Sequence, residues 1–290
     1  MSNFINTIDK VGDNALTDSM IDRTITEFHS DSVTEIGSYA FGYCGKLASL
    51  ALPNAISIGT NAFIECASLA TADLPVVESV GVGAFSKCVA LTTLDMSNVQ
   101  SISSNAFNYC SKLASINLPK VTIIDSNGFS YCEMLKTVSL AAITNIRSNV
   151  FSNCVSLRSI DMPNVTVVNA NAFSYCGALR EVVLPKVTSI STNAFSYCDM
   201  LTKVDLPVVT SIGSNAFYYC AGLTSLIIRT ETVCGLSNTN AFTSTAIANG
   251  VGYIYVPDKL IEGYKTATNW SIYADQFRSI EDYPDICGTV

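Results

Sequence analysis

The chain has 290 residues, of which 49% are hydrophobic and 14% are charged, within the range of globular proteins. Its net charge of −8 argues against nucleic acid or an anionic membrane surface as the main partner. The longest uninterrupted apolar runs are only a few residues long, far short of a membrane-spanning helix. We therefore expect a soluble protein without membrane insertion.

Residues 1–24 are expected to form an amphipathic helical cap, broken near Gly12, that shields the open edge of the first repeat. The apolar side chains of this segment recur at steps of three to five residues: Phe4, Ile8, Val11, Leu16 and Met20. The segment has neither the basic start nor the apolar stretch of a secretion signal. Either the protein is not exported by a cleaved signal, or the chain begins after one.

Residues 25–245 repeat with a period of 22 residues. The phenylalanines that mark the period are Phe41, Phe63, Phe85, Phe107, Phe129, Phe151, Phe173, Phe195 and Phe217. Each of them has a cysteine three residues later, from Cys44 to Cys220. Because a unit this short cannot bury its own apolar face, its copies must stack into a solenoid with one continuous core.

Each repeat begins with a predicted strand, for which Leu113, Ile116 and Leu118 serve as the example. These side chains are expected to line the interior, and Pro119 closes the strand because proline cannot donate a ladder hydrogen bond. A second apolar pair follows, such as Val121 and Ile124, and suits a short extended stretch on another side of the rung.

An asparagine and the phenylalanine–cysteine pair complete the repeat. The asparagine is expected either to cap a short helical turn or to form a ladder along the stack. Nine of the eleven cysteines occupy one repeat position, which favours free, buried thiols with a packing role. A disulfide ladder is the less favoured alternative, because equivalent Cβ vectors of stacked rungs run parallel. No second ligand recurs beside each cysteine, so we predict no metal site.

The order L-x-x-I-x-L-P, V-x-x-I and N-A-F-x-x-C resembles the BspA-like subclass of bacterial leucine-rich repeats over about residues 25–245. The resemblance implies a β-rich leucine-rich-repeat solenoid of the α/β horseshoe type. A parallel sheet would form its concave face, and short turns or 3₁₀ segments its convex face. It also implies a binding or adhesive surface protein of bacteria or their mobile elements, and not an enzyme.

Residues 246–290 are expected to form a C-terminal cap, because the period fails after Ile228. Gly252 to Val256 is predicted to be a strand, and Pro257–Asp258 to begin a helix. This stretch is similar to the terminal segment that follows many such bacterial arrays. Trp270 is interpreted as a core residue of the cap and not as a ligand platform.

Outward-facing side chains of the predicted concave sheet are the natural contact surface of a solenoid. The charged candidates on this face are Asp73, Asp95, Lys136, Arg158, Asp161, Arg180, Lys203 and Asp205. One interpretation is that they form exposed ion pairs, each of which contributes little to stability. The other is that Asp73 and Asp95, like charges on adjacent rungs, repel each other until a cation or a basic partner group relieves the repulsion. A dedicated calcium site is disfavoured, because calcium takes six or more oxygen ligands.

A convex column of tyrosines lies one residue before the cysteines, and its candidate residues are Tyr109, Tyr131, Tyr175, Tyr197 and Tyr219. The column either shields the turns or forms an interaction stripe. Shielding is favoured, because the position belongs to the repeat itself.

Catalysis has little support in the sequence. His29 is the only histidine, and the chain shows no acid–base pair, glycine-rich phosphate loop or zinc spacing. We predict a non-enzymatic recognition or adhesion module, without a cofactor, that binds a protein or glycan. The alternative is a structural or host-binding component of a phage or prophage particle. The family resemblance favours an extracellular or cell-surface location, and the oligomeric state is left open.

Overall fold

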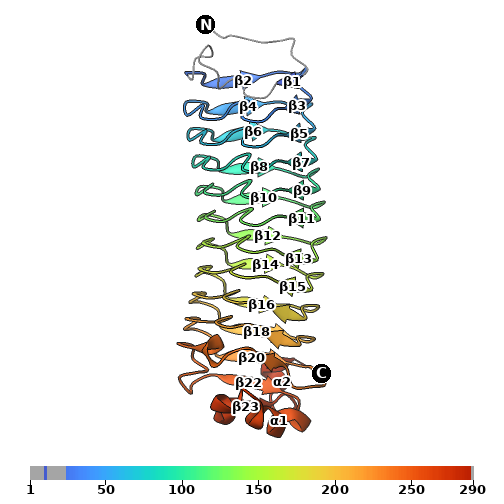
Figure 1. The fold of residues 1–290 in the computed structure, drawn as a ribbon, viewed down its shortest axis with the longest axis vertical. Helices are drawn as coiled ribbons and strands as arrows, with labels where there is room; N and C mark the ends of the chain where they lie inside the picture. The colour runs from blue at the N-terminus through green and yellow to red at the C-terminus, as the bar shows by residue number, and fades with distance from the viewer. Residues whose placement is uncertain (1–9, 12–23, 289–290) are drawn as a thin grey trace. The chain divides into compact units, whose positions relative to one another are not determined.

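A computed structural model describes residues 10–11 and 24–288 of the chain (Figure 1). The chain divides into two units: residues 1–142 with 150–155, and residues 143–149 with 156–290. Both consist of parallel β-solenoid rungs of about 22 residues, which confirms the predicted fold class. The predicted N-terminal helical cap lies mostly outside the described residues. Within it, Lys10–Val11 is strand β1, so the helix prediction is wrong at these two positions.

Each rung of the first unit contributes one longer and one shorter strand (Figure 1). The shorter strands form one six-stranded parallel sheet, whereas the longer strands are divided among smaller sheets. The longer strands are β2 (Glu27–His29), β4 (Ser49–Ala51), β6 (Thr71–Asp73), β8 (Thr93–Asp95), β10 (Ser115–Asn117) and β12 (Thr137–Ser139). The shorter strands are β1, β3 (Glu35–Ile36), β5 (Ser57–Ile58), β7 (Ser79–Val80), β9 (Ser101–Ile102) and β11 (Ile123–Ile124). Ser49 pairs with Thr71 and Ser57 with Ser79, so neighbouring strands are in register at equal repeat positions.

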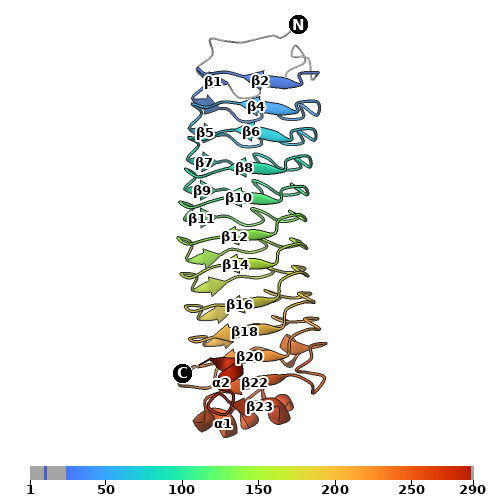
Figure 2. The same ribbon diagram turned by 180° about the vertical axis from the view of Figure 1, so that it is seen from behind.

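The second unit continues the two-strand rung and then departs from it (Figure 2). Its longer strands are β14 (Ser159–Asp161), β16 (Glu181–Val183), β18 (Lys203–Leu206), β20 (Ser225–Ile228), β22 (Tyr253–Val256) and β23 (Phe277–Ser279). The shorter strands are β13 (Asn145–Ile146), β15 (Val167–Val168), β17 (Ser189–Ile190), β19 (Ser211–Ile212) and β21 (Gly235–Leu236). The helical segments are η1 (Thr239–Phe242), η2 (Asp258–Leu260), α1 (Ile261–Thr266), η3 (Ser271–Gln276) and α2 (Pro284–Cys287).

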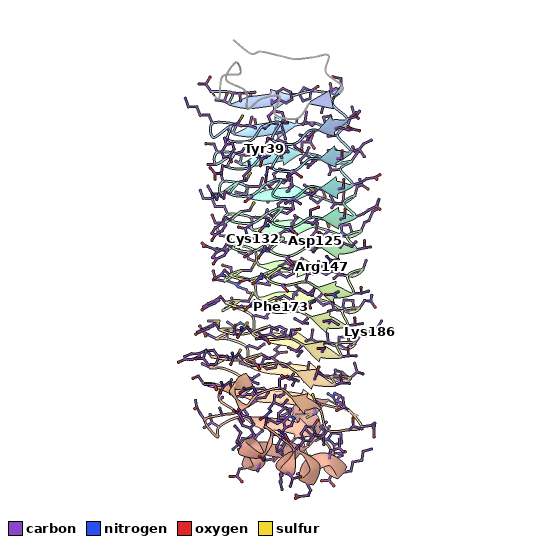
Figure 3. The ribbon with its side chains drawn as sticks, in the orientation of Figure 1. Tyr39, Asp125, Cys132, Arg147, Phe173 and Lys186 are labelled. Carbon is purple, nitrogen blue, oxygen red and sulfur yellow. The ribbon has the colours of Figure 1, made fainter. Side chains whose placement is uncertain are left out.

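Phenylalanine and cysteine columns form the core of the rungs. Phe107 is fully buried between Phe85 and Phe129, with ring centroids 5.2 and 5.1 Å away and rings nearly parallel. The thiol of Cys132 donates to the carbonyl oxygen of Phe107 at 3.2 Å, and other repeat cysteines make the same bond. In Figure 3, Cys132 lies inside its rung, whereas Lys186 extends from the outer edge of another. The prediction that these cysteines are free and buried is confirmed.

The asparagine position has a different role from the predicted helix cap. Asn105 has a φ of 60°, in the left-handed region that asparagine and glycine tolerate best. Gly83 occupies the equivalent position with a φ of 61°. The backbone there turns so that Asn105 N–H donates to the carbonyl oxygen of Ser126 on the next rung, at 3.1 Å. The repeats with asparagine or glycine in this conformation therefore close through turns, whereas the last repeat has the short helix η1, capped by the Asn238 side chain.

The C-terminal segment confirms the predicted strand, now β22, and a helical segment after Pro257. Trp270 is fully buried, and its indole N–H donates to the carbonyl oxygen of Cys234 at 2.6 Å. The hydroxyl of Tyr264 accepts the backbone N–H of Cys234 at 2.9 Å. These contacts confirm Trp270 as a core residue.

Candidate binding site

An open groove crosses strands β6, β8 and β10 of the first unit. Successive side chains of a strand point to opposite faces, so the residues on either side of each inward residue stand outward in two rows. We call Thr71, Thr93 and Ser115 the hydroxyl row, and Asp73, Asp95 and Asn117 the acidic row. The groove between the rows has a volume of about 470 Å³, and its lining residues are Thr71, Ala72, Thr93, Leu94, Asp95, Ser115, Ile116 and Asn117. It therefore offers hydroxyl, amide and carboxylate groups.

The two aspartates of the acidic row have different surroundings. The Asp95 carboxylate accepts the backbone N–H of Ser97 at 3.0 Å and the side-chain amide of Asn117 at 3.4 Å. Ser97 stands where most repeats have proline, and proline has no N–H to donate. Pro75 occupies this position after Asp73, and no hydrogen bond to the Asp73 carboxylate is found among the described residues. Both aspartates are exposed, and Asp95 lines the groove, so the groove carries accessible negative charge.

The other charged candidates lie outside this groove. Lys136 is exposed in the first unit, immediately before β12. Arg158, Asp161 and Arg180 are exposed in the second unit. These four residues stay predicted contact residues of the longer-strand face.

Lys203 and Asp205 have a different role from the predicted ligand contacts, because the C-terminal segment covers them. Lys203 Nζ donates to the carbonyl oxygen of Ile286 at 2.7 Å. Arg229 donates to both carboxylate oxygens of Asp205, at 3.1 and 2.9 Å, and also to the carbonyl oxygen of Cys287. These contacts hold α2 against the outer face of β18 and β20 (Figure 1).

Apolar contacts complete the attachment of the C-terminal segment. Ile227 and Tyr255 stand at outward positions of β20 and β22, yet they are buried in a cluster with Ile280 and Cys287. Large apolar side chains at outward strand positions were the sequence signal for this covering. Sequence reasoning missed it, because the outward strand positions were treated as one repeating contact surface.

Arg229→Ala is expected to loosen the C-terminal segment. The change removes two hydrogen bonds to the half-buried Asp205 carboxylate and one to the Cys287 carbonyl oxygen. The free energy that attaches the segment should fall by about 1–3 kcal/mol. Burial raises the pKa of the Cys287 thiol, so its release should increase both the exposure and the thiolate fraction of this residue. Alkylation of Cys287, followed by mass spectrometry, should become faster. Arg158→Ala removes an exposed arginine of the same unit and is the control; equal rates in both variants would contradict the expectation.

The tyrosine column consists of rings that stack on one another. Tyr109 and Tyr131 have centroids 4.2 Å apart with rings inclined by 8°, and Tyr175 and Tyr197 are 4.4 Å apart at 4°. Tyr219 lies on Tyr197 at 5.2 Å. Where the column lacks tyrosine, as at Lys87 and Glu65, an ion pair of 2.6 Å links the rungs instead. Because the ring faces contact each other, the arrangement favours the shielding interpretation over a binding stripe.

The remaining candidates add no second site. The His29 imidazole lies 3.2 Å from the Asp31 carboxylate, and both side chains are exposed. Over the described residues, no group of three or more histidine, cysteine, aspartate or glutamate side chains is arranged to hold a metal ion. The helices of the described part of the chain are all too short or too polar to cross a membrane.

Comparison with known proteins agrees with this architecture. The family described as BspA type leucine rich repeat region (6 copies) matches residues 2–92, 34–158 and 144–260. A search of curated proteins finds no match.

Two solved structures are similar to the chain. A leucine-rich repeat protein from Bacteroides ovatus ATCC 8483 is 21% identical, with a TM-score of 0.56, and the match covers 89% of this chain and 84% of that one. A leucine rich cell surface protein from Faecalibacterium prausnitzii A2-165 is 21% identical, with a TM-score of 0.49 and coverage of 95% and 88%. Since the family match spans nearly all of the repeats, the chain belongs to the BspA-type leucine-rich repeat family.

Proposed function

We propose that this protein is a non-enzymatic recognition or adhesion module, and that the groove on β6, β8 and β10 binds its protein or glycan ligand. The groove itself is the observation that carries the proposal. It exposes hydroxyl, carboxylate and amide groups on paired strands, because β8 is hydrogen-bonded in register to β10, and β6 to β4. Such preorganised polar groups keep the ordering cost of binding low.

The polar character of the groove distinguishes it from a covered surface. At the far end of the second unit, the corresponding strand face carries Ile227 and Tyr255 and is closed by the chain's own C-terminal segment. The groove of the first unit carries Thr93, Asp95 and Asn117 instead, which are exposed. A face with these side chains suits a ligand that hydrogen-bonds. The family resemblance supports a location outside the cell or at its surface.

Thr93→Tyr should abolish ligand binding by filling the groove at its centre. Thr93 is an exposed β8 residue, so the larger side chain extends outward without disturbing the core. The wild-type chain would be screened on protein, peptide and glycan arrays, and each ligand retested with the variant. We expect a loss of about tenfold or more in affinity, as when one or two hydrogen bonds and their packing are removed.

Thr122→Tyr is the matched control, because Thr122 is an exposed threonine of the same unit just before the shorter strand β11. It should leave binding unchanged. If Thr93→Tyr binds every array ligand as tightly as the wild type, the groove is not the binding site. If the wild type binds nothing on arrays of all three kinds, the recognition function is wrong.

A further inference from the structure

Asp205 in the second unit identifies the kind of group that an aspartate at this repeat position binds. It occupies the position that Asp73 occupies in the first unit, and both are followed by leucine and proline. Because proline has no N–H, neither carboxylate can accept the local hydrogen bond that Ser97 gives to Asp95. Asp205 is satisfied instead by the guanidinium of Arg229, which contacts both of its oxygens.

The first unit has no arginine of its own at the corresponding place. Arg229 follows Asp205 by 24 residues, and the residue 24 positions after Asp73 is Ser97. The serine hydroxyl lies 3.5 Å from the Asp95 carboxylate, so its contacts belong to the next rung. The groove next to Asp73 is lined by Thr71, Thr93 and Asp95 among others, and its lining includes neither lysine nor arginine. The acidic row therefore has carboxylate acceptors like that of Asp205, but no arginine that corresponds to Arg229.

We propose that this groove binds an arginine side chain of an extended peptide segment of a partner protein. The inference rests on the proposed recognition function and names the ligand class for the same site. The guanidinium is held by the carboxylate of Asp95, which lines the groove, as Asp205 holds Arg229. The exposed Asp73 stands at the equivalent position of the preceding rung. A guanidinium is the best match, because its five N–H donors lie in one plane and two of them can bind the two oxygens of a carboxylate.

The rest of the groove suits the backbone of such a peptide. Arg229 also donates to the carbonyl oxygen of Cys287, and Lys203 donates to that of Ile286, so the longer-strand face already holds a peptide main chain within this molecule. In the first unit, the hydroxyl row supplies groups that can donate to and accept from a peptide backbone. The net charge of −8 also favours approach of a basic segment over an acidic one.

A pair of synthetic peptides tests the assignment. The first is a fluorescein-labelled Thr-Arg-Thr-Arg-Thr peptide with blocked ends, and the second has citrulline in place of both arginines. Citrulline keeps the shape of the side chain and removes its charge. Fluorescence anisotropy should show binding of the arginine peptide to the wild-type chain, weakened about tenfold or more by citrulline, because the charge-assisted hydrogen bonds are lost.

Protein variants separate the site from general attraction to an acidic protein. Asp73→Asn with Asp95→Asn should lose the same factor of about ten, whereas Glu78→Gln with Glu133→Gln, two exposed glutamates of the same unit, should keep wild-type affinity. Equal binding of the two peptides, or equal effects of the two double variants, would overturn the proposal. If the arginine peptide does not bind while array ligands remain sensitive to Thr93→Tyr, the ligand class is wrong and the recognition function stands.

Discussion

Phe107→Ala should lower the free energy of unfolding by about 3–5 kcal/mol. Phe107 is fully buried and stacks on Phe85 and Phe129, so truncation leaves a cavity that touches three successive rungs. The rings above and below also lose their stacking partner, and these contacts add to the burial term. Neighbouring rungs cannot close the gap, because hydrogen bonds fix the spacing of their backbones. An example is the bond from Phe107 N–H to the carbonyl oxygen of Gly128.

Urea denaturation followed by circular dichroism measures this loss. Val89→Ala in the same unit is the control: Val89 is 39% exposed, so its truncation should change the free energy of unfolding by less than about 0.5 kcal/mol. A loss below about 1 kcal/mol for Phe107→Ala would mean that the core repacks around the cavity, in conflict with a rigid phenylalanine column.

The repeat made most of the fold predictable. Each rung packs against rungs of similar sequence, so one short pattern predicts the surroundings of nine phenylalanines and nine cysteines. The longer strand, the shorter strand and the buried core all followed from the spacing of apolar residues. The left-handed backbone at Asn105 did not follow, because asparagine serves equally as a helix cap, and only the replacement by Gly83 hinted at the positive φ.

The binding face was predictable only where it repeats. Asp73 and Asp95 emerged from the strand alternation, and the structure leaves both exposed and places Asp95 in the lining of the groove. Asp205 is covered because it binds Arg229, and Arg229 in turn binds Cys287, 58 residues further along the chain. Among the described residues such a contact occurs once, so the repeat pattern does not predict it. Sequence reasoning therefore found the surface but not which part of it the chain itself occupies.

Stability should fall steeply as the pH rises above about 8.5, the ordinary pKa of a cysteine thiol. Burial raises the pKa of the repeat thiols well above that value in the folded protein; those affected include Cys66, Cys88, Cys110, Cys132, Cys154 and Cys198. The unfolded chain releases these protons above pH 8.5 and the folded chain retains them. The stabilisation is thus complete below the unfolded pKa and is lost as the pH rises towards the folded one.

The number of thiols makes this effect large. Each one can remove roughly 1.4 kcal/mol per pH unit once the unfolded thiol is fully ionised, so six together approach roughly 8 kcal/mol per pH unit. Urea denaturation at several pH values from neutral to 10, with a reductant present, measures the slope. Cys110→Ala with Cys132→Ala lowers stability at every pH, but it should reduce the slope by roughly 3 kcal/mol per pH unit, since two of the contributing thiol protons are removed. A slope that is flat between pH 8.5 and 10, or unchanged in the double variant, would show that these thiols ionise as readily in the folded chain as in the unfolded one. That outcome is incompatible with a thiol such as Cys132, which is buried and donates a hydrogen bond to the carbonyl oxygen of Phe107.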